Sequence, residues 1–108
     1  MLRYAIGDLP EGALDAADHF HAEWLPMLRH HLDVGSDIAL VFPLADHTHN
    51  EWRRAVVAGL AREYAPARAN AISGDDGEAI EAALEYLVHS PAITGQLLTV
   101  DGKPGKTR

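Results

Sequence analysis

The sequence predicts an α/β fold in three layers, with four parallel strands alternating with three helices. Short apolar segments alternate along the chain with longer segments whose hydrophobic residues recur every three or four positions, the spacing of one helical face. Residues 38–42 contain no polar side chain, as expected for a parallel strand covered by helices on both faces. Proline, glycine and aspartate mark the boundaries between these segments.

The N-terminal part is predicted to form one strand and the longest helix. The strand covers residues 2–6, and Asp8 and Glu11 after it have the three-residue spacing of a capping box. A helix over residues 12–32 follows, and Pro26 should kink it or break it locally, because proline removes a backbone donor. The helix residues expected to face the core are Leu14, Ala17, Phe20, Trp24, Leu25, Leu28 and Leu32.

The middle of the chain repeats the order of strand and helix. The strand over residues 38–42 ends at Pro43, and a polar loop follows it. Thr48 and Glu51 offer a second capping box, for a helix that runs through Tyr64. One side of this helix is apolar, and the other carries small alanines that suit close packing on a sheet or on another helix.

The C-terminal part adds two strands and one helix. Pro66 ends the preceding helix, and a strand over residues 67–73 follows. Asp75 and Glu78 have capping spacing at the start of a helix that Ser90 and Pro91 terminate, and the last strand covers residues 97–101. Strands and helices that alternate in this way imply parallel strands joined by right-handed crossovers.

Length and composition limit the classes of protein to consider. A chain of 108 residues fits one domain, which we place at residues 1–101, followed by a flexible basic tail over residues 102–108. No apolar run approaches the roughly 20 residues that span a membrane. The first residues do not have the order of a signal peptide. We therefore expect a cytoplasmic location.

Charge and cysteine content exclude several functions. The chain has no cysteine, which excludes disulfides, thiolate catalysis and cysteine-ligated metals. Its formal net charge of −7 argues against a nucleic-acid partner, because such binding depends on lysine and arginine neutralising phosphates. Six of the seven histidines fall into close pairs, and none of the helical pairs has the spacing of three or four that shares a face. The loop residues Asp46, His47 and His49 could reach one metal ion, although a solvated capping loop is the commoner explanation.

Three motifs in the second half of the chain point to a known family. A helix ends in Leu60-Ala61-x-Glu63, a strand contains Asn70-Ala71-Ile72, and the chain continues through Thr94-Gly95-Gln96 to Val100-Asp101-Gly102. Together they resemble the C-terminal part of the short-chain dehydrogenase/reductase (SDR) family. The four predicted strands look like that family's fourth to seventh. The resemblance therefore implies a truncated Rossmann-like domain without the first strand and its Gly-rich turn, so that NAD(P) binding is not expected.

The resemblance also places the family's catalytic positions. Family members carry Tyr-x-x-x-Lys on the helix that here begins near residue 50, and the match puts Asn50 at the Tyr position and Arg54 at the Lys position. Asn50 cannot donate the proton, and Arg54 has too high a pKa to shuttle one. Arg54 could still bind an anion, as a weak remnant of cofactor binding. The family's serine is replaced by the loop that begins at Pro43.

Three functions remain open. The first is a non-catalytic module that self-associates or docks onto a full-length SDR-like partner. The second is a subunit of an NAD(P)-dependent oxidoreductase that another chain completes. The third is a module that binds a small ligand or a nucleotide through Arg54 and the strand ends.

Self-association as a dimer is the favoured mode of action. The strand over residues 2–6 matches one that the family's first strand covers, so it would form a bare hydrophobic edge. The helices over residues 12–32 and 51–65 resemble those that form the subunit contact in many family members. Their aromatic residues Phe20, Trp24, Trp52 and Tyr64 are candidate interface anchors. Packing of these four side chains in the core is the competing explanation.

Overall fold

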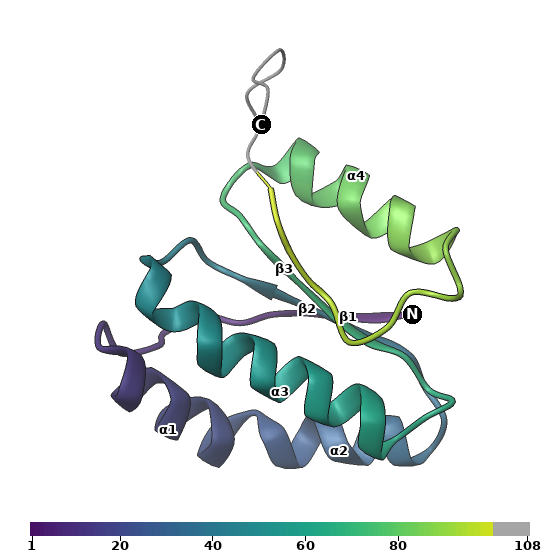
Figure 1. The fold of residues 1–108 in the computed structure, drawn as a ribbon, viewed down its shortest axis with the longest axis horizontal. Coiled ribbons are helices and arrows are strands. Elements are labelled where there is room, and N and C mark those ends of the chain that lie inside the picture. Colours follow the sequence, from purple (N-terminus) through teal and green to yellow (C-terminus); the bar gives the residue numbers. More distant parts are fainter. Residues whose placement is uncertain (101–108) are drawn as a thin grey trace.

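Four parallel strands lie side by side in chain order in the computed structural model, which describes residues 1–100 (Figure 1). They are β1 (Leu2–Ala5), β2 (Ile38–Phe42), β3 (Ala69–Ser73) and β4 (Leu97–Thr99). The predicted α/β class with four parallel strands is confirmed. β2 has the bounds that its apolar run predicts, and the other strands are shorter than expected. Residue 101 and the predicted tail over residues 102–108 lie outside the described residues.

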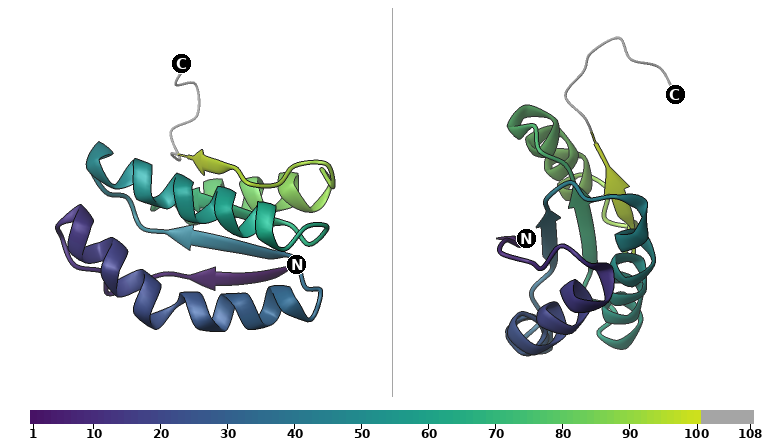
Figure 2. Two further views of the ribbon diagram at one scale, coloured as in Figure 1. Left: turned by 60° about the horizontal axis from the view of Figure 1, so that its bottom comes forward. Right: turned by 90° about the vertical axis from the view of Figure 1, so that its left-hand side faces the viewer.

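Helices cover both faces of this sheet, which gives the three predicted layers. The helices α1 (Ala13–Glu23), α2 (Leu25–Asp33) and α3 (Asn50–Glu63) pack on one face, and α4 (Gly77–Val88) packs on the other (Figure 2). The described chain therefore has four α-helices rather than three, because the helix predicted over residues 12–32 is divided at Trp24. Pro26 lies in the first turn of α2, where a missing N–H costs no helical hydrogen bond.

The crossovers do not all have the predicted right hand. The connections β2–α3–β3 and β3–α4–β4 each move one strand further in the same direction across the sheet, but α3 and α4 lie on opposite faces (Figure 2). The two connections therefore have opposite hands, and the one through α4 is left-handed. Right-handed crossovers are the strong general preference. The sequence gives the limits of α4, but its periodicity does not say which face of the sheet it covers.

The predicted capping boxes are wrong in detail. α1 begins after Gly12 without a side-chain cap, so Asp8 and Glu11 do not form one. A short 3-10 turn, η1 (His47–His49), precedes α3, and its cap is Asp46, which accepts a hydrogen bond from the Thr48 N–H at 2.9 Å. Thr48 is therefore a donor to the cap and not the cap itself. A turn that tightens before the helix moves the capping role to an earlier residue.

At α4 the cap is one residue later than predicted. The Asp76 side chain accepts a hydrogen bond from the Ala79 N–H at 2.9 Å, where the sequence suggested Asp75 with Glu78. Two neighbouring aspartates offer equivalent caps in the sequence, and the backbone of the turn decides between them.

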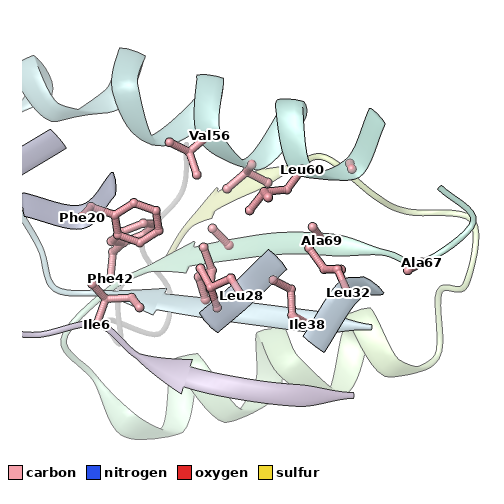
Figure 3. Packing of buried hydrophobic residues seen from close by; sticks show 14 residues of the cluster. Ile6, Phe20, Leu28, Leu32, Ile38, Phe42, Val56, Leu60, Ala67 and Ala69 are labelled. Atoms are coloured by element: carbon pink, nitrogen blue, oxygen red, sulfur yellow. The ribbon is translucent and has the colours of Figure 1, made fainter. Parts of the chain in front are cut away.

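The core divides into two clusters on the two faces of β2. Side chains alternate across a strand, so Ile38, Leu40 and Phe42 face the helices α1 to α3, while Ala39 faces α4. Figure 3 shows the larger cluster between the sheet and α1 to α3. Both faces of β2 are buried, which is the physical reason that its sequence carries no polar residue.

The family-like motifs hold the last strand in place. Asn70 of β3 is completely buried, donates from Nδ2 to the Ile93 carbonyl at 3.0 Å and accepts from the Gln96 N–H at 3.1 Å. Gly95 has a φ of +77°, and a Cβ there would lie 3.4 Å from the Cβ of Ala61 on α3. An L-residue would be strained in this conformation. The Asn-Ala-Ile and Thr-Gly-Gln motifs therefore have a structural role in joining β4 to the sheet.

One helix residue lies where the sequence did not predict it. Leu14 belongs to the expected core-facing stripe, but its side chain is 85% exposed on α1. Phe20, Leu28 and Leu32 from the same predicted stripe are buried. The first turn of α1 therefore leaves an apolar side chain at the surface, while Ala16 two residues later is buried.

Leu28→Ala and Leu84→Ala should each lower the free energy of unfolding by about 2–5 kcal/mol, the cost of truncating a buried aliphatic side chain. Leu28 is fully buried beneath α2, and Leu84 is 7% exposed beneath α4. Chemical denaturation measures the loss, and Val88→Ala, at a half-exposed position of α4, is the matched control. A loss below about 1 kcal/mol at both leucines would contradict the core described here.

Candidate functional site

A cavity of about 290 Å³ opens at the carboxyl ends of the strands, between the loop after β1 and the loop after β2. In open parallel sheets this edge is the usual place for a ligand. The residues that line the cavity are Asp8, Leu9, Pro10, Glu11, Pro43, Leu44, Ala45, Asp46, His49 and Arg53. The lining thus contains three carboxyl groups, one imidazole and one guanidinium.

His49 joins the two loops that form the cavity. Its side chain is 4% exposed, and its Nε2 lies 2.9 Å from the carbonyl oxygen of Glu11. The indole N–H of Trp52 donates to its Nδ1 at 3.1 Å. A carbonyl only accepts and an indole N–H only donates, so these partners select the neutral imidazole with its proton on Nε2. Both ring nitrogens are engaged within the fold, which leaves neither free for a substrate or a metal.

Arg53 lies one helical turn after His49 and carries the cation of the cavity. Its side chain is 2% exposed, and Nη1 donates to the Pro43 carbonyl at 2.9 Å and to Ser73 Oγ at 3.3 Å. The guanidinium carbon lies 4.5 Å from the centre of the Phe42 ring, a cation–π contact. Arg53 therefore connects the ends of β2 and β3.

The guanidinium of Arg53 is only partly satisfied. Its Nε is buried without a hydrogen-bond partner, and no ion pair within residues 1–100 includes Arg53. Burial lowers the pKa of Arg53 from its ordinary value, because desolvation disfavours the charged form. An arginine nevertheless keeps its proton in a protein. A buried cation without a carboxylate partner is costly, and this cost marks Arg53 as a binding candidate.

The carboxyl groups of the cavity come from two loops: Asp8 and Glu11 from the loop after β1, and Asp46 from the loop after β2. Hydrogen bonds from the hydroxyl and the N–H of Thr48 lower the pKa of Asp46, so that this carboxylate stays charged. Asp8 has a φ of +57°, in the left-handed region that aspartate adopts more readily than most residues. Asp8, Glu11 and Pro10 all come from the loop that His49 holds.

The predicted catalytic positions do not lie in this cavity. Asn50 is half-buried at the start of α3 and Arg54 is exposed, and neither belongs to its lining. His49 and Arg53 have the same four-residue spacing and do line it. The small residues Ala55 and Gly59 that follow them place the family positions at Asn50 and Arg54. Arg53 was not predicted as a site residue, because helical periodicity does not show which of the two neighbouring arginines faces the strand ends.

The family comparison agrees with the fold and with the motifs. A family model for short-chain dehydrogenase-like proteins, designated SDR-like, matches residues 4–100. The chain belongs to the short-chain dehydrogenase-like family. Comparisons with curated proteins and with solved structures gave no match. In this SDR-like chain, the cavity at the strand ends is the candidate site, because open parallel sheets generally bind ligands at the carboxyl ends of their strands.

The predicted interface residues have different environments. Phe20 is completely buried within the single chain, where its ring lies 5.7 Å from that of Phe42, so core packing accounts for it. Trp24, Trp52 and Tyr64 are half-buried and pack against the edge of the same cluster. These three side chains retain a surface that a partner could contact.

The described residues show neither a metal cluster nor a membrane-spanning helix. Residues 1–100 hold no group of three or more histidines, aspartates and glutamates placed to bind one metal ion. Asp46 instead accepts hydrogen bonds from Thr48, and His47 is exposed. No helix in this part of the chain is long and apolar enough to cross a membrane.

Proposed function

We propose that this SDR-like chain is a non-catalytic module that acts through self-association. The observation that carries the proposal is Leu14, an 85% exposed leucine beside an apolar hollow of about 430 Å³ between α1 and α3. The hollow, here called the α1–α3 groove, is lined by Ala13, Leu14, Ala17, Thr48, Glu51, Trp52 and Ala55. An exposed large apolar side chain next to an apolar groove is typical of an interaction surface.

A second copy of the chain fits this surface. In a two-fold dimer the same patch serves both subunits, so each Leu14 would enter the α1–α3 groove of the other copy. The alanines at positions 13, 17 and 55 allow close approach of a partner helix. Trp52 is half-buried at the floor of the groove and is supported by Phe20 at 5.5 Å between ring centres. A rigid aromatic side chain in such a place is a suitable anchor.

The chemistry of the cavity supports a non-catalytic role. A dehydrogenase of this family needs a tyrosine as proton donor and a lysine beside it. No tyrosine or lysine lines the cavity that residues 1–100 form at the strand ends. His49 cannot replace the tyrosine, because its N–H already donates to the Glu11 carbonyl. Arg53 cannot replace the lysine as a proton shuttle at ordinary pH.

The open edge of β1 favours a second candidate function, in which another chain completes an oxidoreductase. The Leu2 N–H donates to the Asp37 carbonyl just before β2, and the Ile6 N–H donates to Val41 of β2. The backbone groups of Arg3 and Ala5 therefore point away from the sheet. A strand from an SDR-like partner could pair with these groups. Arg3 forms an ion pair with Glu81 of α4, and a charged residue on an edge strand generally opposes such pairing.

The isolated chain should bind neither NADH nor NADPH with micromolar affinity, and it should not oxidise or reduce alcohols and carbonyls with them. The reason is the absence of the Tyr and Lys pair from the cavity. Calorimetric titration with each nucleotide provides the measurement. Micromolar dissociation constants or cofactor-dependent turnover would contradict the non-catalytic role.

The chain should behave as a dimer, and Leu14→Arg should convert it to a folded monomer. A charge at this position would be placed in the partner's apolar groove, whereas the isolated chain already exposes residue 14 to water. Light scattering coupled to size exclusion gives the mass, and circular dichroism checks the fold. Val88→Arg on α4, another exposed apolar position, is the matched control and should remain dimeric. A single-chain mass for the unmodified protein at all concentrations would rule out self-association.

A further inference from the structure

The buried His49 is hydrogen-bonded to both sides of the α1–α3 groove. Its Nε2 lies 2.9 Å from the carbonyl oxygen of Glu11, which directly precedes Gly12, the N-cap of α1. Its Nδ1 accepts the indole N–H of Trp52, which lines the groove from α3. Leu14, the residue that should enter the groove of a second copy, follows Glu11 by three positions. One imidazole therefore holds the start of α1 and the floor of the groove in place.

Only a neutral imidazole makes both of these hydrogen bonds. With its proton on Nε2 the ring donates to the Glu11 carbonyl and accepts from Trp52, whereas an imidazolium carries an N–H on both nitrogens and has no acceptor. A proton on Nδ1 would therefore point at the N–H of Trp52, a donor against a donor. His49 is 4% exposed, so water does not readily replace the lost acceptor.

Trp52 cannot turn away from His49 without changing the groove. The centre of its ring lies 5.5 Å from that of Phe20 and 5.6 Å from that of Phe42, and the guanidinium carbon of Arg53 lies 5.7 Å from it. These contacts fix the indole at the floor of the groove. Separating the two N–H groups therefore moves either the indole or the His49 ring with the loop that it holds. Either movement alters a surface that the second copy would contact.

The charges around His49 do not distinguish a closed groove from an open one. They come from the loop after β1, the loop after β2 and the start of α3, and the titratable and charged residues are Asp8, Glu11, Asp46, His47, Glu51 and Arg53. The carboxylates favour an imidazolium and the guanidinium opposes it, in either conformation. The contact with Trp52 exists only in the closed groove. A proton shifts the equilibrium between two states through such a difference alone.

We propose that protonation of His49 opens the α1–α3 groove and dissociates the dimer. This regulation rests on the proposed self-association. The closed groove excludes a proton from Nδ1 and the open groove accepts one, so the open state binds one proton more per subunit. Self-association is therefore strongest at the alkaline end of the range from about pH 8 to about pH 5, in which histidine gains its charge, and weakens as the pH falls.

The first test measures the dimer at two pH values. Light scattering coupled to size exclusion, over a dilution series, gives the dissociation constant at about pH 8 and at about pH 6. Both values lie above the sequence pI of about 5.3, so the chain keeps a net negative charge. The dissociation constant should rise at least about tenfold at the lower pH, because two subunits each take up a proton. A single-chain mass at the higher pH would overturn self-association and the His49 switch together, whereas equal dissociation constants at both pH values would overturn the switch alone.

The second test assigns the response to one histidine. His49→Gln keeps a donor for the Glu11 carbonyl and an acceptor for Trp52 but cannot gain a charge, so its dissociation constant should be the same at both pH values. His47→Gln changes the exposed histidine of the same turn, is the matched control, and should keep the full response. A response that survives in His49→Gln, or that disappears in His47→Gln, would refute the assignment.

The indole of Trp52 gives a further measurement on the unmodified chain, which is needed if His49→Gln does not fold. The chain has two tryptophans, so its NMR spectrum has two indole N–H signals, and Trp24→Phe identifies the signal of Trp52. This signal should move over the same pH interval as the mass, because the hydrogen bond to His49 is lost. A Trp52 signal that stays unchanged while the dimer dissociates would overturn the proposal.

Discussion

The arrangement of the candidate site depends on the two hydrogen bonds of one buried histidine. His49 joins the Glu11 carbonyl in the loop after β1 to the Trp52 indole on α3. Glu11 and His49 are 38 residues apart in the sequence. Through this contact the loop after β1 forms the outer wall of the cavity. Trp52 is in turn fixed against Phe20 and Phe42 in the core. A buried polar group with both partners satisfied stabilises one conformation, because any other would leave a donor or acceptor unpaired.

Fixing His49 also sets the direction of Arg53. Residues four apart share a face of a helix, so a residue one turn after His49 must project toward the same cavity. The exposed Arg54, although it is the next residue, therefore cannot take part in the site. In this SDR-like chain the buried pair beside the cavity is His49, with both ring nitrogens hydrogen-bonded, and the cation Arg53.

Much of the fold follows from local sequence patterns. The run at residues 38–42 predicts β2 because burial on both faces excludes polar side chains, and the parallel direction of the strands follows from their alternation with helices. A local break of the first helix was predicted at Pro26, and the division lies two residues earlier, at Trp24. The capping by Asp46 and Asp76 and the left-handed crossover through α4 were not predicted. Each of these is decided by tertiary packing or by turn geometry, which local periodicity does not contain. The site was missed for a related reason, since a shift of one residue on a helix moves a side chain by about 100°, from the cavity to solvent.

The hydrogen bonds of His49 make it a structural group with its proton on Nε2. Nitrogen-15 NMR of the imidazole ring distinguishes a protonated ring nitrogen from an unprotonated one and therefore reports the tautomer directly. At neutral pH we expect His49 to show a protonated Nε2 and an unprotonated Nδ1, with a slowly exchanging Nε2 proton because the side chain is 4% exposed. The exposed His47 in the same turn serves as the internal reference and should show rapid averaging between tautomers. A proton on Nδ1 of His49, or averaging like that of His47, would contradict this structural role.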